Sequence, residues 1–145
     1  MKKVEVDIHI SVNPEQVISS FLDQNMLKVW WEVKRSFISP QPNGPYILSW
    51  SITTGGFGFV TTAIIDKIDA MSFQLSNMMY LNPEISILGP MSLEVVATPT
   101  PNGSKVYICQ SGYQEGGDWD WYYEAVTNAW PIAANNLKRY LENLK

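Results

Sequence analysis

The chain has 145 residues, of which 46% are hydrophobic and 17% charged, and its formal net charge is −4. This length suffices for one domain with a substantial core. The mild negative charge excludes a protein that tracks nucleic-acid phosphates, because such proteins carry a basic patch. The longest basic cluster is the pair Lys34–Arg35. We therefore expect a single domain over residues 1–145 with no nucleic-acid partner.

Hydropathy and cysteine content indicate the compartment. No run of eighteen apolar residues occurs, so we expect no membrane span. Residues 1–10 read MKKVEVDIHI and alternate in polarity, whereas a signal peptide has an unbroken apolar segment. The single cysteine, Cys109, excludes an internal disulfide and is expected to be a buried, inert thiol. Together these features predict a cytoplasmic protein.

The first forty residues predict a strand, two short helices and a second strand. Apolar and polar residues alternate over 4–10, which is typical of a half-buried strand. Asn13 can cap a helix, and Pro14 fits its first turn. A second short helix is expected at about 24–30, and a strand at 33–38.

The middle of the chain predicts further strands joined by tight turns. They are expected at 46–52, 57–68, 71–79, 85–98 and 105–113. Gly89–Pro90 is expected to form a bulge or bend on an edge strand. The connections are too short for crossovers, so the strands should pair antiparallel.

The end of the chain predicts one long helix, from about Asp118, its expected cap, to Asn143. Pro131 should kink this helix near residues 127–131 without dividing it. Apolar residues recur every three or four positions. They are Trp119, Tyr122, Val126, Trp130, Ala133, Leu137, Leu141 and Leu144. This face must be buried on the strands, and a helix laid across a curved sheet can enclose a cavity.

The residue types exclude several kinds of catalytic site. His9, the single histidine, falls on the polar face of the first strand, which argues against Ser-His-Asp or Cys-His catalysis. A zinc site needs three or four converging ligands, which the chain cannot easily supply. Residues 55–58 lack the Lys-Ser/Thr of a phosphate loop and predict a hairpin instead. Four carboxylates cluster near the start of the last helix: Glu115, Asp118, Asp120 and Glu124. Negative charge is favourable at this end of a helix dipole, so we interpret the cluster as helix capping and not as a site of acid–base catalysis. We expect no catalytic residue, no metal and no cofactor.

The aromatic residues, 12% of the chain, carry the functional hypothesis. Most should form the core, but apolar pockets are also lined by aromatic side chains with a few polar groups. Asn77 and Gln110 fall on the inward phase of apolar strands, and buried amides need a partner, such as backbone, water or a ligand. The candidate ligand-binding residues are Trp30, Trp50, Phe59, Phe73, Asn77, Met91, Gln110, Tyr122, Val126 and Trp130.

Three segments resemble the family of homologues of the activator of heat-shock protein 90 ATPase, within the START-like (SRPBCC, helix-grip) superfamily. They are KVEVDIHISVNPEQVISSFLD; GGFGFV followed by IIDKIDAMSFQLS; and VYICQSGYQEGGDW followed by WPIAANNLKRYLENLK. The resemblance implies an α+β helix-grip fold. In it, a curved antiparallel sheet of six to seven strands wraps round a long C-terminal helix, with two short helices after the first strand.

The resemblance also implies a cavity between the sheet and the long helix. Members of the superfamily bind lipids, hormones or polyketides, and some are cyclases or hydratases. Three hypotheses follow, each for a monomer or homodimer. The first, which we favour, is a module that binds an apolar small molecule or lipid and is not an enzyme. The second is a chaperone-interacting protein, and the third is a cofactor-free cyclase or lyase that acts on a hydrophobic substrate.

Overall fold

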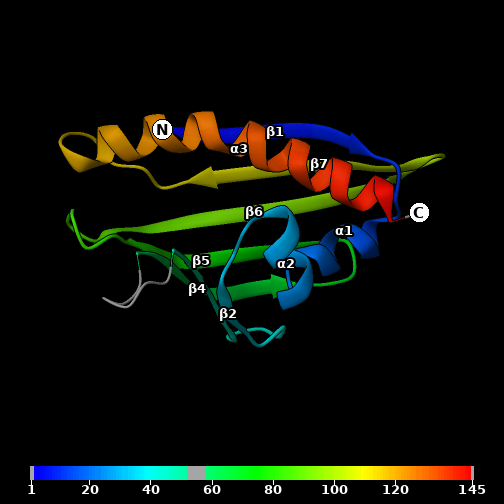
Figure 1. Ribbon diagram of the computed structural model, residues 1–145, viewed down its shortest axis with the longest axis horizontal. Helices are drawn as coiled ribbons and strands as arrows, with labels where there is room; N and C mark the ends of the chain where they lie inside the picture. Colours follow the sequence, from blue (N-terminus) through cyan, green and yellow to red (C-terminus); the bar gives the residue numbers. More distant parts are fainter. Residues whose placement is uncertain (1, 52–57, 145) are drawn as a thin grey trace.

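The computed structural model describes residues 2–51 and 58–144, and these residues form a seven-stranded antiparallel sheet and three helices (Figure 1). The strands are β1 (Lys3–Ile10), β2 (Arg35–Ile38), β3 (Pro45–Trp50), β4 (Phe59–Ile68), β5 (Ser72–Leu81), β6 (Leu88–Thr100) and β7 (Gly103–Ser111). The helices are α1 (Pro14–Ser20), α2 (Gln24–Trp30) and α3 (Asp118–Asn143). The predicted fold class is therefore confirmed.

The strand order is β1-β7-β6-β5-β4-β3-β2, so β1 and β2 are the two edges of the sheet. β1 pairs with β7 along its whole length, from Lys3 opposite Ser111 to Ile10 opposite Ser104. α1 and α2 then carry the chain across to the other edge. All three helices lie on one side of the curved sheet (Figure 1), and this side holds the core.

Local signals in the sequence explain the short helices. The side chain of Asn13 accepts from the N–H of Gln16, whose own side chain accepts from the N–H of Asn13, so α1 begins with a capping box. Asp23 caps α2 by accepting from the N–H groups of Asn25 and Met26. Both helices begin where the sequence predicts.

The long helix is continuous from Asp118 to Asn143 with Pro131 inside it, which confirms its predicted bounds. The kink at Pro131 stays a prediction. The cap was predicted wrongly: Gly117 is the N-cap residue, with a positive φ of 52° and no side-chain hydrogen bond. Asp118 instead accepts from the N–H and hydroxyl of Ser86, which ties α3 to the loop before β6. Its carboxylate still favours the positive end of the helix.

A β-bulge in β5 overturns the predicted orientation of Asn77. The register of β5 against β6 shifts between Leu75 and Met78, and Asn77 has a φ of 50°. The extra residue moves Met78 to the inner face and leaves Asn77 exposed. Asparagine tolerates this left-handed conformation better than most residues.

Four further expectations need correction. Gly89–Pro90 lies in β6, which is an interior strand and not an edge, although the register is irregular there. Cys109 is half-buried on the outer face and not fully buried. Leu144 is 56% exposed and does not anchor α3, whereas Leu137 and Leu141 are buried as predicted. The second strand begins at Arg35 and not at residue 33. The predicted hairpin at 55–58 lies mostly outside the described residues.

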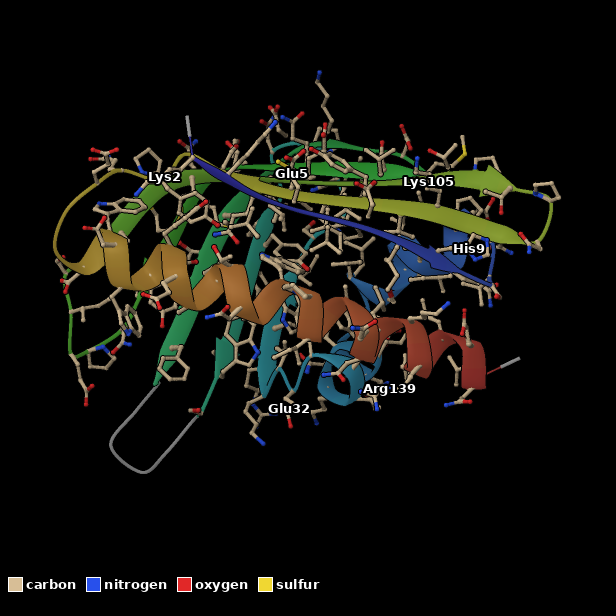
Figure 2. All side chains as sticks on the ribbon, turned by 90° about the horizontal axis from the view of Figure 1, so that it is seen from above. Lys2, Glu5, His9, Glu32, Lys105 and Arg139 are labelled. Carbon is tan, nitrogen blue, oxygen red and sulfur yellow. The ribbon has the colours of Figure 1, made fainter. Side chains whose placement is uncertain are left out.

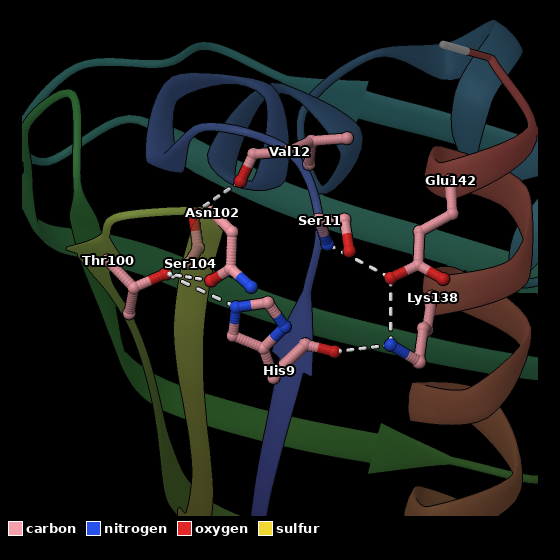
Figure 3. Close-up of polar contacts among 8 residues, drawn as sticks. All are labelled: His9, Ser11, Val12, Thr100, Asn102, Ser104, Lys138 and Glu142. Atoms are coloured by element: carbon pink, nitrogen blue, oxygen red, sulfur yellow. Dashed lines mark hydrogen bonds and ion pairs between the residues drawn. The ribbon is translucent and has the colours of Figure 1, made fainter.

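The C-terminal half of α3 is tied to the end of β1 by an ion pair (Figure 3). Lys138 Nζ lies 2.7 Å from Glu142 Oε2 and donates to the carbonyl of His9 at 2.7 Å. Glu142 Oε2 also accepts from the N–H of Ser11 at 2.9 Å. His9 itself lies at the rim of the sheet, where Nε2 is 3.2 Å from Thr100 Oγ1. The ion pair therefore satisfies two backbone groups where β1 ends.

This ion pair predicts a pH-dependent part of the stability. Hydrogen bonds from Lys138 and Ser11 lower the pKa of Glu142 from 4.5 to about 2. The folded protein therefore binds this proton more weakly than the unfolded chain, so the stabilisation is present above pH 4.5 and is lost as the pH falls toward 2. Between pH 5 and pH 3, we expect the melting temperature of Glu142→Gln to fall less than that of the wild type. Thermal unfolding followed by circular dichroism measures both.

Glu124 supplies the matched control, because it lies on the same helix, is exposed, and makes no ion pair with any described residue. Glu124→Gln should follow the wild-type pH profile. Identical profiles for all three proteins would show that the ion pair contributes nothing.

Candidate ligand-binding pocket

A pocket of about 310 Å³ lies between the sheet and the N-terminal half of α3. Its walls are formed by residues of β3 to β7 and of α3, together with Trp31 after α2. The residues that line it are Trp31, Tyr46, Leu48, Trp50, Phe59, Thr61, Leu75, Met78, Tyr80, Leu93, Gln110, Trp121, Tyr122, Ala125, Val126, Ala129, Trp130 and Ala133. Figure 2 shows α3 crossing the sheet, with the labelled charged residues Glu5, Glu32, Lys105 and Arg139 on the outside of the molecule.

The space exists because α3 presents small side chains where it crosses the strands. Ala125, Ala129 and Ala133 are four residues apart, so they share one face of the helix, and all three line the pocket. Opposite them, β3 contributes Leu48 and Trp50. An alanine cannot span the gap that larger side chains elsewhere on the helix fill.

Aromatic contacts fix the wall at the Trp31 end. The Trp31 ring lies 5.2 Å from that of Trp130 and 5.5 Å from that of Trp50, measured between centroids. Trp50 Nε1 donates to the carbonyl of Trp31 at 2.9 Å, which sets the orientation of the Trp50 ring. These distances are in the range favoured by aromatic pairs, so this end of the pocket is preformed.

Gln110 provides a buried polar group in the wall. Its Oε1 accepts from Trp130 Nε1 at 2.8 Å, and its Nε2 donates to Tyr122 Oη at 3.1 Å and lies 3.6 Å from Met91 Sδ. The three residues Gln110, Tyr122 and Trp130, here called the amide network, come from β7 and α3 and are each at most 7% exposed. The network joins the helix to the sheet at the pocket.

The tyrosines of the pocket are neutral hydroxyl groups at ordinary pH. Burial raises the pKa of Tyr122 to about 12, against a smaller lowering by the hydrogen bond from Gln110. Burial also raises the pKa of Tyr80, again against a smaller lowering by the hydrogen bond from Asn82. Both hydroxyls can therefore donate or accept a hydrogen bond, and neither serves as a general base near pH 7.

The structure places the ten predicted site residues in three groups. Six line the pocket: Trp50, Phe59, Gln110, Tyr122, Val126 and Trp130. Trp30, Phe73 and Met91 are buried in the core and do not line it. Trp30 donates to the carbonyl of Ser20, and Phe73 packs against Phe21 and Tyr46. Asn77, as described above, is exposed and does not line the pocket.

Sequence reasoning missed several lining residues. Met78 and Tyr80 were not among the candidates. Alternation through Asn77 ignores the bulge and leaves Met78 off the inner face, and Tyr80 lies beyond the predicted strand at 71–79. Trp121, Ala125 and Ala129 lie beside the predicted apolar stripe of α3, whereas Ala133 belongs to the stripe but was not a candidate site residue. Alanines repeated every four residues next to an aromatic stripe are the signal that could have revealed the pocket.

The described residues offer little for catalysis. Residues 2–51 and 58–144 contain no group of three His, Cys, Asp or Glu residues arranged to hold a metal ion. Of the residues identified as lining the pocket, only Tyr46, Tyr80 and Tyr122 can ionise.

No helix in the described part of the chain combines the length and the apolar character that crossing a bilayer requires.

Solved structures share this architecture. Protein MLL2253 of Mesorhizobium loti has 18% sequence identity and a TM-score of 0.77, with 99% of each chain covered. The Aha1 dimer of Colwellia psychrerythraea has 16% identity and a TM-score of 0.70, with 98% of this chain and 97% of that chain covered. DynU16, a protein in the dynemicin biosynthetic locus, has 14% identity and a TM-score of 0.71, and this chain spans 49% of it.

No protein-family model and no curated protein sequence matches the chain. The chain has a START-like, helix-grip fold, on the evidence of these structural neighbours. At identities below 20% the likeness concerns the fold alone, because one fold can hold many unrelated sites.

The amide network predicts a stability effect of the Trp130 N–H. Trp130→Phe keeps an aromatic ring but leaves Gln110 Oε1, in a side chain 3% exposed, without its donor. We expect a loss of about 1–3 kcal/mol in the free energy of unfolding, which is the cost of an unsatisfied buried polar group. Urea denaturation measures it.

Trp121 is the control, since it lies on the same helix, is 50% exposed and donates no hydrogen bond to a described residue. Trp121→Phe should change the free energy by less than about 0.5 kcal/mol. Equal losses for both substitutions would mean that ring size, and not the hydrogen bond, matters at Trp130.

Proposed function

We propose that this protein binds an apolar or amphipathic small molecule in the pocket between the sheet and α3. The observation that carries the proposal is a preformed cavity of about 310 Å³ whose wall is aromatic and aliphatic apart from a few oriented polar groups. Small-molecule sites commonly have this composition and a volume of roughly 300–1,000 Å³. The cavity lies at the small end of that range and suits a compact ligand of two or three rings.

Apolar burial is sufficient to hold such a ligand. A ligand that buries roughly 300 Å² of apolar surface gains about 7 kcal/mol at about 25 cal/mol per Å². The walls bury surface of their own, and the loss of translational and rotational freedom offsets part of the gain. Micromolar affinity, about −8 kcal/mol, is therefore a reasonable expectation.

Ligand binding is favoured over catalysis by the chemistry of the wall. General acid–base catalysis at neutral pH usually needs a histidine or a carboxyl group within hydrogen-bond reach of the substrate. Among the described lining residues the groups that can ionise are tyrosines, and burial raises the pKa of Tyr80 and Tyr122. A cyclase or lyase role therefore ranks below binding.

A chaperone partner ranks lower again. Its support is the fold-level similarity to the Aha1 dimer of Colwellia psychrerythraea, at 16% identity. The same similarity is compatible with a homodimer. A single domain over residues 1–145 and a cytoplasmic location remain parts of the proposal.

Blocking the cavity from the helix side tests the proposal. Ala129→Phe places a ring in the pocket, whereas Asn128→Phe adds the same ring to the exposed side of the same helical turn. An environment-sensitive apolar dye should bind the wild type at one site with micromolar affinity. We expect Ala129→Phe to weaken binding at least tenfold and Asn128→Phe to change it less than twofold, in a fluorescence titration.

Two results would contradict the proposal. The wild-type protein could fail to bind any apolar dye, or both substitutions could reduce binding equally, which would place the dye on the surface. Melting temperatures of the two variants, measured alongside, show whether each is folded.

A further inference from the structure

The direction of every hydrogen bond in the amide network follows from Trp130. An indole N–H can donate but not accept, so the atom of Gln110 that lies 2.8 Å from Trp130 Nε1 must be the amide oxygen. This orientation turns the amide nitrogen toward Tyr122, at 3.1 Å from Oη. The amide N–H₂ can only donate, so Tyr122 Oη is the acceptor of that bond.

The hydroxyl proton of Tyr122 therefore points away from Gln110. No described residue accepts it, although the side chain is only 7% exposed. Tyr122 lines the pocket, as Gln110 and Trp130 do. A buried donor without an acceptor is costly, so the free proton indicates what the pocket is built to receive.

We propose that the ligand of this pocket is a neutral, largely aromatic molecule with one hydrogen-bond-accepting oxygen, a carbonyl or an ether, to which Tyr122 Oη donates. This inference rests on the proposed ligand-binding function and adds to it the chemical class of the ligand. The network makes Tyr122 a donor of fixed direction, so it orients the ligand in the pocket.

The charge of the wall supports a neutral ligand. No lysine, arginine or histidine is among the described residues that line the pocket. A carboxylate or phosphate group buried there would have no cation to pair with, and burying an unpaired charge is strongly unfavourable. The hydroxyl of Tyr122 can meet a neutral oxygen without that cost.

The shape of the wall supports an aromatic ligand. Trp31, Trp50, Phe59, Tyr80 and Trp121 all line the pocket, and aromatic rings pair favourably in offset or edge-to-face arrangements. Phe59 and Trp121 are 39% and 50% exposed, which leaves ring surface that a ligand can cover.

Three other lining residues carry a hydroxyl: Tyr46, Thr61 and Tyr80. Tyr46 already donates to the carbonyl of Phe21 at 2.6 Å, whereas the network does not fix the direction of the other two hydroxyls. Tyr80 Oη accepts a long hydrogen bond from Asn82 Nδ2, at 3.4 Å. Thr61 lies opposite Tyr80 in the β4–β5 pair. If Tyr80 or Thr61 were the donor to the ligand oxygen, substitution of Tyr122 would leave recognition of that oxygen unchanged. The experiment below therefore separates Tyr122 from these two alternatives.

Fluorenone and fluorene test the inference, because they share one planar three-ring framework and differ in a C=O in place of a CH₂. Tryptophan fluorescence quenching gives the two dissociation constants for the wild type and for Tyr122→Phe. We expect the preference for fluorenone over fluorene to fall about threefold to tenfold in Tyr122→Phe, as one neutral hydrogen bond is lost. Fluorene binding should change by less than twofold.

Two matched variants serve as controls. Tyr113 is another buried tyrosine whose hydroxyl has no partner among the described residues, and it does not line the pocket. Tyr113→Phe should keep the wild-type preference. Thr61→Val removes a competing donor and should also keep the wild-type preference for fluorenone. A preference that survives in Tyr122→Phe, or is lost in Thr61→Val, would overturn the inference.

The infrared carbonyl band of bound fluorenone gives a readout on the wild-type protein alone. A hydrogen bond from Tyr122 should shift the band to lower frequency than in cyclohexane, whereas an unshifted band would overturn the inference. If neither compound binds the wild type, the proposed function itself fails. If both bind without any preference and the band is unshifted, ligand binding stands and the assignment of Tyr122 falls.

Discussion

The hydrogen bond from Trp130 Nε1 to Gln110 Oε1 is the contact on which the pocket depends. It joins the middle of α3 to β7 in a buried setting, where losing either partner would strand a polar group. Trp130 fills the space between helix and sheet at this point, whereas the small side chains of Ala125 and Ala129, which precede it on the same helix, do not. The cavity is therefore bounded by one large residue and left open by small ones on the same helix.

Local signals in the sequence predicted the elements well. The cap at Asn13, the bounds of α3 and the pairing of the strands follow from residue patterns that act over a few positions. Asn77 was misplaced because the bulge in β5 depends on how this strand pairs with β6, which alternation along one strand does not reveal. The cap of α3 was misplaced because Asp118 instead bonds Ser86, thirty-two residues away in the sequence.

The same distinction applies to the pocket. Gln110 stood out in the sequence as an amide on an apolar strand face, and the structure gives it partners. The free proton of Tyr122 could not be inferred from spacing, since it depends on two residues of α3 meeting one residue of β7. The fold, shared with structures at 14–18% identity, supplies the space between helix and sheet. The residues of this chain decide what fits there.

A crystal structure of the protein soaked with fluorenone tests the central claim most directly. The account predicts the three-ring framework between Trp50 and Ala129, with the carbonyl oxygen within hydrogen-bond distance of Tyr122 Oη, about 2.7–2.8 Å. An empty pocket at a saturating concentration, or a compound bound on the outer surface of the sheet, would contradict the claim that this space is a ligand site. A compound in the pocket with its oxygen turned away from Tyr122 would contradict the role of the amide network.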